Sequence, residues 1–211
     1  KEYASFDSYV KNHNFANLDY VYSTLSNHDG ENPVDYAAFE ANPTGFTVVA
    51  CNAEDGSTKY FGKSDVGYDN FDILKASSAV PVACEPYAID GIPYYDGGIA
   101  DPIPVQKAID DGFEKIVLIL TRQQGYRKLY TKPSMLRLYA KYFRHFPKFL
   151  SALYAVPTRY DAQQREIDRL EKEGRIFVIR PQGPVNVSHT EKDTAKLKAL
   201  YEEGRQEAAR R

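Results

Sequence analysis

The sequence predicts an α/β fold, arranged as a three-layer α/β/α sandwich around a mainly parallel sheet. Between residues 92 and 121, a short strand, a helix and a second strand follow one another, which is the order of a parallel α/β unit. The second of these strands, "KIVLILT", is a continuous apolar run typical of a strand buried on both faces. The chain after residue 122 is rich in helical patterns.

Length and composition indicate a single globule without a membrane span. The chain has 211 residues, of which 43% are hydrophobic, enough for one sizeable core. No apolar run approaches the ~20 residues that a bilayer span needs, and no signal segment opens the chain at Lys1. Cys51 and Cys84 lie far apart without a C-x-x-C pattern, so we expect buried, reduced thiols. We therefore expect a cytoplasmic protein, at most peripheral at a membrane.

The N-terminal part combines short helices with a hairpin. Apolar periodicity predicts the first helices, and Asn32-Pro33 is a start signal for the third of them. Two β-branched runs flank the turn sequence "EDG", which predicts a β-hairpin. The expected helices cover residues 2–11, 17–26 and 34–41, and the expected strands cover residues 45–52 and 58–63.

The middle of the chain leads to an acidic residue at a strand end. Asp69 is expected to cap a helix over residues 70–79, which Pro81 terminates. Asp90-Gly91 predicts a turn before the short strand "IPYY", and Asp96 follows that strand directly. A helix ending at Gly112 comes next.

The remaining elements divide the chain into two parts. We expect a helix over 134–156 interrupted at Pro147, a helix over 161–173, a strand over 175–181 and a final helix from about residue 189. Residues 1–122 then form the α/β domain, and residues 123–211 form a helix-rich C-terminal extension packed on it.

Asp96 is the first candidate for chemistry. Reactive groups in open α/β sheets collect at the carboxyl ends of strands, and Asp96 is followed by Gly97 and Gly98. Glycines at these two positions can adopt positive φ and allow a ligand or another backbone to approach closely. We expect them to bind substrate or shape the turn. The alternative is that "YDGG" is only a turn that ends a strand.

The surroundings of Asp96 resemble a known family. "ILKASSAVP" followed by "YYDGGIADPIPVQKAIDDGFEKIVLILT" is similar to the downstream half of bacterial patatin-like phospholipases, in which an A-S-x-A-x-P helix end precedes a D-G-G or D-G-A segment. The resemblance covers roughly residues 44–122. The sequence "DPIP" stands where many members carry N-x-P, so the detailed shape of that loop is expected to differ.

The resemblance implies a lipid acyl hydrolase with a Ser-Asp dyad and no cofactor. Asp96 would be the dyad aspartate, and the substrate would be a lipid or a small ester. The family carries its serine on G-x-S-x-G, with a Gly-rich oxyanion loop upstream, and neither pattern occurs in these 211 residues. Both precede the resembling segment in the family's order. We therefore expect this chain to be the downstream part of a hydrolase whose N-terminal segment is missing, and to be inactive alone.

Other serines and histidines fit structural roles better. Ser77 and Ser78 lie at a helix end without the flanking glycines of a nucleophile elbow, and we expect this helix end to pack near the Asp96 loop. His189 follows Asp96 in the order of a triad, but Ser188 to Glu191 is typical of a helix capping box. The remaining histidines lack ligand spacing, so we expect no metal site. They are His13, His28 and His145.

Basic and aromatic residues alternate over residues 127–150. The net charge of the chain is only −2, yet residues 116–160 contain nine Lys or Arg and no acidic residue. Such a stretch can contact a phospholipid surface, or it can be an amphipathic helix pair with a solvated basic face. No nucleic-acid-binding motif accompanies it, so we expect no nucleic-acid partner. The alternative to the hydrolase is a non-catalytic module that binds a lipid or a protein on the same fold.

Overall fold

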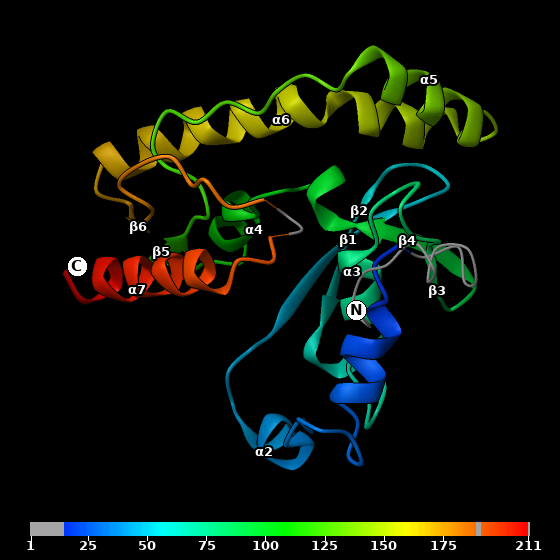
Figure 1. Ribbon diagram of the computed structural model, residues 1–211, viewed down its shortest axis with the longest axis horizontal. Helices are drawn as coiled ribbons and strands as arrows, with labels where there is room; N and C mark the ends of the chain where they lie inside the picture. Colours follow the sequence, from blue (N-terminus) through cyan, green and yellow to red (C-terminus); the bar gives the residue numbers. More distant parts are fainter. Residues whose placement is uncertain (1–14, 189–190, 211) are drawn as a thin grey trace. The chain divides into compact units, whose positions relative to one another are not determined.

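A computed structural model describes residues 15–188 and 191–210, and the chain divides into two compact units. Unit 1 contains residues 1–102 and 130–156, and unit 2 contains residues 103–129 and 157–211. Figure 1 shows their elements in chain order. The helix predicted over 2–11 lies outside the described residues. The domain boundary at residue 122 stays a prediction.

Unit 1 is built on a four-stranded sheet with the order β2-β1-β4-β3. The predicted hairpin is confirmed, because β1 and β2 pair antiparallel. A second hairpin joins β3 to β4 through Asp90 and Gly91, whose φ angles of 52° and 79° are those of a tight hairpin turn. The strand β3 is too short for the sequence pattern to reveal. The strands are β1 (Thr47–Asn52), β2 (Thr58–Gly62), β3 (Tyr87–Ile89) and β4 (Ile92–Asp96).

The expected mainly parallel sheet is wrong for this unit. All three strand pairs of the four-stranded sheet are antiparallel. The physical reason is that two of these pairs are hairpins with short connections, which can join only antiparallel strands. The strand after β4 in the chain, β5 (Ile116–Ile119), does not join this sheet but pairs with β6 (Ile176–Ile179).

Helices cover both faces of the unit 1 sheet, as an α/β fold requires. On one face, Ala50 and Tyr94 pack with Ile73 of α3. On the other face, Cys51 and Tyr95 belong to a cluster formed with α5 and the first turns of α6. The helices of this unit are the π-helix η1 (Tyr20–Leu25), α2 (Tyr36–Ala41), α3 (Asp72–Ser78), α5 (Pro133–Tyr142), the start of α6 (Pro147–Lys172), and the 3-10 turns η2 (Lys63–Asp65) and η3 (Gly97–Ile99).

Asp69 does not cap α3. The helix begins after Phe71, which makes no side-chain cap, and Asp69 itself has a positive φ of 51°. Its carboxylate instead accepts hydrogen bonds from the backbone and the ring of His28. A competing partner from another segment therefore displaces the predicted cap.

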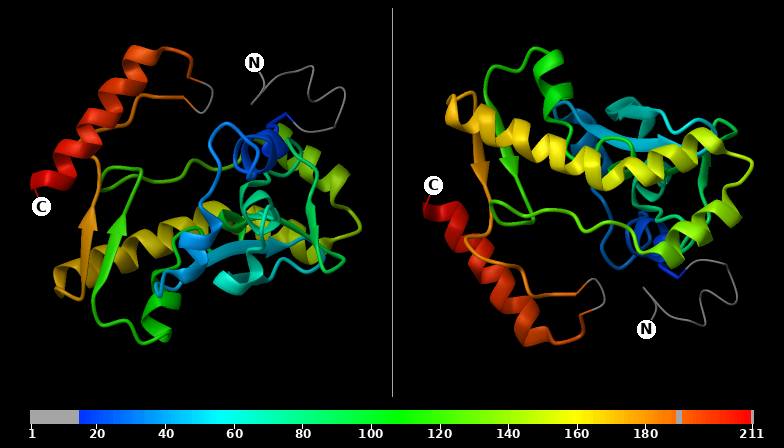
Figure 2. Two further views of the ribbon diagram at one scale, coloured as in Figure 1. Left: turned by 90° about the horizontal axis from the view of Figure 1, so that it is seen from below. Right: turned by 90° about the horizontal axis from the view of Figure 1, so that it is seen from above.

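Unit 2 contains α4 (Val105–Asp110), the parallel pair β5–β6, the second part of α6 and α7 (Thr194–Arg210). The two strands pair from Ile116↔Ile176 to Ile119↔Ile179 and point the same way side by side in Figure 2. Their inner face packs on α6 and α4. The cluster consists of Val105, Ile167, Leu170, Ile176 and Val178.

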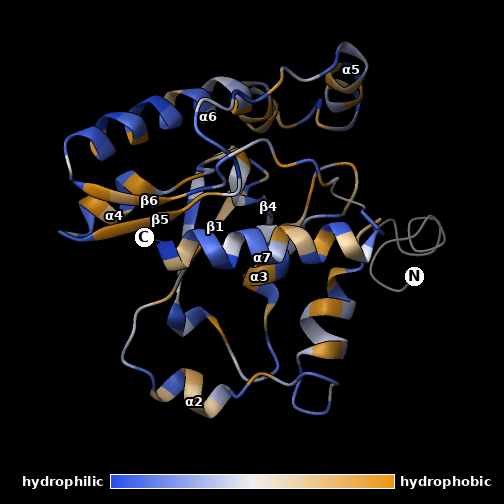
Figure 3. Ribbon diagram, turned by 60° about the vertical axis from the view of Figure 1, so that its left-hand side comes forward, coloured by the Kyte–Doolittle hydropathy of each residue, from blue (hydrophilic) through white to orange (hydrophobic). Residues whose placement is uncertain are grey.

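The prediction that β5 is buried on both faces is wrong. Val117 and Ile119 are 59% and 77% exposed, and Phe177 of β6 is 42% exposed. These side chains alternate along the strands with the packed ones, so a whole apolar face of the pair is open among the described residues. Figure 3 shows both strands in the colours of hydrophobic residues.

The C-terminal helices differ from the prediction in their limits. Pro147 separates two helices as expected, but α6 then continues through Pro157 to Lys172, so no separate helix begins at 161. The last helix begins at Thr194 rather than near 189, so Ser188 is not its cap. The carboxylate of Asp193 accepts hydrogen bonds from the amides of Ala195 and Lys196 at 2.9 and 3.3 Å. His189 lies outside the described residues.

None of the helices in the described part of the chain is long and apolar enough to cross a bilayer.

Candidate active site

Asp96 is the last residue of β4 and the first residue of the turn into η3. Its amide donates to the carbonyl of Ala79 at 2.9 Å, and its Oδ1 accepts from the amide of Gly98 at 2.7 Å. In the sheet it lies opposite Ala50. These contacts fix a half-buried carboxylate at a strand end, where the sequence predicted it.

Position 97 requires glycine because of close packing, not because of its φ angle. A Cβ at this position would lie 2.3 Å from the carbonyl oxygen of Val49 in β1, so no side chain fits. A Cβ on Gly98 would lie 3.1 Å from Oδ1 of Asp96. Neither glycine uses the positive φ that is open to glycine. Gly97 thus allows the turn to cross β1 closely, and Gly98 supplies the amide that orients Asp96.

The end of α3 packs beside this turn. Ala76 and Ala79 are completely buried, and the carbonyl of Ala79 binds the amide of Asp96. The Oγ atom of Ser78 lies 3.1 Å from the hydroxyl of Tyr22, a contact between α3 and η1. The small residues therefore bring the helix end close to Asp96, as expected.

The strand that carries Asp96 is anchored by aromatic packing. Tyr95 stacks on Phe149 at 5.3 Å and meets the edge of Phe143 at 5.8 Å. Burial raises the pKa of Tyr95 far above its ordinary value, and the charge of Glu85 adds to this effect. Tyr95 therefore acts as a neutral packing residue. Its ring contacts anchor the end of β4 and so hold the adjacent Asp96 in position.

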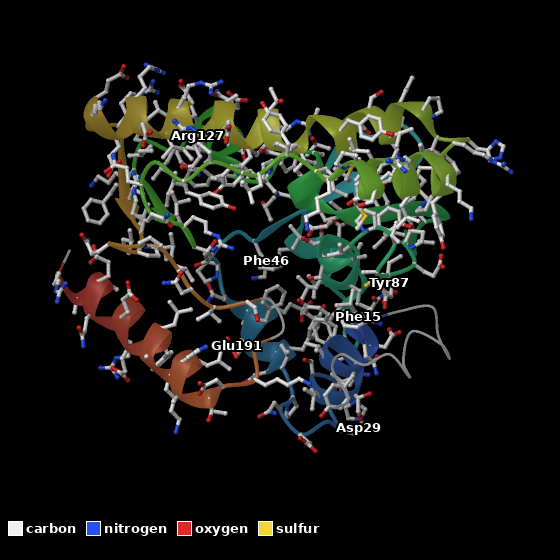
Figure 4. The ribbon with its side chains drawn as sticks, turned by 45° about the horizontal axis from the view of Figure 1, so that its top comes forward. Phe15, Asp29, Phe46, Tyr87, Arg127 and Glu191 are labelled. Carbon is white, nitrogen blue, oxygen red and sulfur yellow. The ribbon has the colours of Figure 1, made fainter. Side chains whose placement is uncertain are left out.

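A buried cation in α3 was not predicted. Lys75 is only 8% exposed, and its Nζ lies 2.9 Å from Asp19 and 3.0 Å from Asp72. Burial lowers its pKa, but the hydrogen bonds and charges of the two carboxylates outweigh burial and raise it overall. The hydroxyl of Tyr87, labelled in Figure 4, also donates to Asp19 at 3.3 Å. The i, i+3 spacing of Asp72 and Lys75 is the sequence signal that could have indicated half of this cluster.

The described histidines make local contacts. The hydrogen bond with Asp69, and then its charge, raises the pKa of His28, which also stacks on Tyr68. His145 accepts from Nε of Arg144 at 2.8 Å. Among residues 15–188 and 191–210, no three His, Cys, Asp or Glu side chains lie together as metal ligands would. His13 lies outside this part of the chain.

An apolar groove of about 430 Å³ begins directly after Ala79. Val82 in its wall has a φ of 72°, a conformation that β-branched residues rarely adopt. Val80 is 48% exposed. The groove is lined by Phe15, Val80, Pro81, Val82, Ala83, Met135 and Tyr139, and Phe15 is labelled in Figure 4.

The basic stretch has a mixed character. Phe143 and Phe149 are buried in the unit 1 core, in agreement with an amphipathic helix pair. Tyr142 and Phe146 instead remain exposed. Arg137 and Lys141 are exposed and have no acidic partner among the described residues.

Sequence comparison decides the family. Residues 5–109, which include Asp96 with its two glycines and the end of α3, match the family described as patatin-like phospholipase. Through these residues, the chain belongs to the patatin-like phospholipase family. Residues 146–211 match a domain of unknown function, DUF6363. The patatin-like segment therefore precedes a C-terminal extension.

This patatin-like chain also has a curated relative. It is 28% identical over 151 residues to the uncharacterized protein YjjU of Escherichia coli (strain K12). The alignment covers 67% of this chain but only 39% of YjjU. The patatin-like chain thus spans well under half the length of that relative.

Proposed function

We propose that this chain carries the catalytic aspartate of a serine-dependent acyl ester hydrolase acting on lipids, and that Asp96 is that residue. The observation that carries the proposal is the position of Asp96 at a strand end within the patatin-like segment, with Oδ1 held by the amide of Gly98. A carboxylate fixed in this way needs little reorganisation when it accepts a proton.

In the proposed chemistry, Asp96 takes up a proton and gives it back in each half of the reaction. The carboxylate of Asp96 accepts the proton of a serine hydroxyl while the serine oxygen attacks the ester carbonyl. The alcohol leaves with that proton, and an acyl-enzyme remains. A water molecule then loses a proton to Asp96 and attacks the acyl group. The bond to the serine oxygen breaks, the fatty acid leaves, and Asp96 returns the proton to the serine oxygen, which restores the hydroxyl and the carboxylate. Backbone amides stabilise the oxyanion in both steps.

The serine is proposed to lie in polypeptide upstream of these 211 residues. The sequence has no G-x-S-x-G, and YjjU extends beyond the aligned part. The hydrolase proposal therefore concerns this chain together with its natural upstream sequence. The 211 residues alone are expected to be inactive.

The first test compares Asp96→Asn with the unchanged protein, both carrying the natural upstream sequence, on short p-nitrophenyl esters. Loss of the base should lower the rate by about 100-fold or more. Asp90→Asn is the matched control, because it makes the same change in a turn whose positive φ asparagine tolerates. Full activity of Asp96→Asn, or an inert unchanged protein, would contradict the proposal.

We assign the acyl chain of the substrate to the apolar groove beside α3. The wall of the groove starts one residue after Ala79, whose carbonyl binds the amide of Asp96. Its lining is almost entirely apolar side chains, which suits a hydrocarbon chain.

Peripheral membrane contact through residues 127–150 is the second part of this proposal. The double variant Arg137→Gln, Lys141→Gln should reduce co-sedimentation with vesicles containing phosphatidylserine, because two cations near an anionic surface are lost. Binding to phosphatidylcholine vesicles should not change. Equal binding of the variant and the unchanged chain to the anionic vesicles would refute membrane contact by α5.

A non-catalytic lipid- or protein-binding module on the same fold is the alternative, and the exposed basic and aromatic residues of α5 and the segment after it are the observation that favours it. Reading the natural upstream sequence separates the two. A G-x-S-x-G there supports the hydrolase, and its absence supports the binding module.

A further inference from the structure

We propose that unit 2 contains a binding site for a phosphate group, centred on Arg122 at the carboxyl ends of β5 and β6. This site is independent of Asp96 and of the hydrolase proposal. All the residues that form it belong to unit 2.

The two strands deliver their following segments to the same edge. The parallel register continues one residue past β5, because the amide of Leu120 donates to the carbonyl of Ile179 at 2.8 Å. Arg122 follows β5, and its Nη1 lies 3.5 Å from the carbonyl of Val185, which follows β6. Arg122 thus bridges the two segments at the carboxyl edge, where ligands of parallel α/β units bind.

Aromatic rings hold the guanidinium in place. The Cζ atom of Arg122 lies 5.1 Å from the centre of the Tyr126 ring, and Tyr126 meets Tyr160 of α6 edge to face at 5.9 Å. Burial raises the pKa of Tyr160, and the charge of Arg122 opposes that rise, as expected for neighbours. Arg122 is half-buried and has no carboxylate partner among the described residues.

The charges around Arg122 favour an anion. The Nζ of Lys128 lies 5.5 Å from the centre of the Tyr160 ring, and Arg127 is exposed on the same segment (Figure 4). On the facing helix α6, Asp161 contacts this segment, because its Oδ1 accepts from the backbone amide of Lys128 at 3.2 Å. Two further carboxylates of α6, Asp168 and Glu171, are paired with Arg180, and Glu166 is paired with Arg169. Residues 122–128 therefore carry three cations, Arg122, Arg127 and Lys128, and Asp161 is the carboxylate that is seen to contact them.

A neighbouring arginine at the end of β6 shows the contrast. Arg180 is 6% exposed, but it is paired with Asp168 and Glu171 of α6. Its charge is therefore neutralised within the unit. Arg122 instead contacts the ring of Tyr126 and the carbonyl of Val185. These contacts do not neutralise its charge, so the guanidinium can bind an anion from solution.

Phosphate is the anion that this arrangement suits. A planar guanidinium donates two parallel hydrogen bonds to a tetrahedral oxyanion, and Lys128 adds a point charge nearby. Gln123 lies next to Arg122, and its buried side-chain oxygen has no hydrogen-bond partner among the described residues. This oxygen is an acceptor, so a donor such as the P–OH group of hydrogen phosphate would satisfy it.

The test titrates the 211-residue chain with inorganic phosphate and with glycerol 3-phosphate by calorimetry. Arg122→Gln should weaken binding by about 10-fold or more, and Arg122→Lys should also weaken it, because the charge remains but the fork is lost. Arg165→Gln is the matched control, since it removes the same charge from an exposed site on α6. Thermal unfolding confirms that each variant is folded. Equal affinity of Arg122→Gln and Arg165→Gln would overturn the proposal.

A second arm separates a free phosphate from a lipid headgroup. Vesicles of phosphatidylcholine with and without phosphatidic acid are offered to the same variants. Phosphatidic acid binding that Arg122→Gln abolishes assigns the site to a headgroup, and binding of the soluble phosphates alone assigns it to a free ligand. If neither arm shows binding that depends on Arg122, the proposal is wrong.

Discussion

Gly97 illustrates how a single residue determines the geometry of the proposed active site. Its Cα faces the carbonyl of Val49 so closely that an added Cβ would lie 2.3 Å from that oxygen. Gly97→Ala is expected to destabilise the fold by about 3 kcal/mol, because the turn must move away from β1. Chemical denaturation measures this change.

The control for this prediction is Gly45→Ala. A Cβ on Gly45 meets nothing within 4 Å, so this variant should unfold at nearly the same denaturant concentration as the unchanged chain. Similar stability of the two variants would show that the turn has room that the structure does not indicate.

At the residue scale, the sequence predicted the position of Asp96 but not its contacts. Strand and turn signals fall on neighbouring residues, so the strand end could be located. Position 97 requires glycine because the carbonyl of Val49 lies against it. Val49 is more than 40 residues earlier in the chain, and no local sequence pattern indicates such a contact. Lys75 was missed for the same reason, because its burial depends on Asp19.

At the scale of elements, α7 depends on its cap more than the other helices do. Nearly all of its residues are exposed, and Glu207 is the buried one. Asp193→Ala should therefore destabilise unit 2 by about 1 kcal/mol and reduce the helical signal in circular dichroism, because the amides of Ala195 and Lys196 lose their acceptor. Ser188→Ala should change neither. If Ser188→Ala were destabilising and Asp193→Ala were not, Ser188 would be the cap, as the sequence pattern predicted.

The ends of helices and strands could be predicted where turn residues mark them in the sequence. The prediction failed where long-range packing determines whether a helix continues. The turn at Asp90 and Gly91 was predicted correctly because both residue types tolerate positive φ. The continuation of α6 through Pro157 was not, because burial of Phe149, Leu153 and Ile167 along the helix compensates for one missing hydrogen bond.

At the scale of the whole molecule, the open face of β5–β6 should cause self-association. Parallel strands are normally covered on both faces, yet Val117, Ile119 and Phe177 are exposed. The 211-residue chain is expected to sediment as dimers or larger species, and Ile119→Lys should shift it toward the monomer. Ile92→Lys, in the other sheet, should not. A chain that is monomeric without any substitution would contradict this prediction.

The α/β class could be predicted from the alternation of strands and helices, but the direction of the main sheet could not. The strand over 115–121 was assumed to join the preceding strand, because neighbouring elements commonly pair. It pairs instead with residues 176–179, some 60 residues later. The apolar run was identified correctly, and its partner was determined by long-range packing.

The chain passes between its two units three times, after residues 102, 129 and 156. The segment that matches the domain of unknown function begins at residue 146, yet Phe149 and Leu153 within it complete the core beneath Tyr95. Deleting that segment as a separable appendage would therefore empty the interior of the patatin-like half. The two family matches are distinct in sequence, but they share one folding unit.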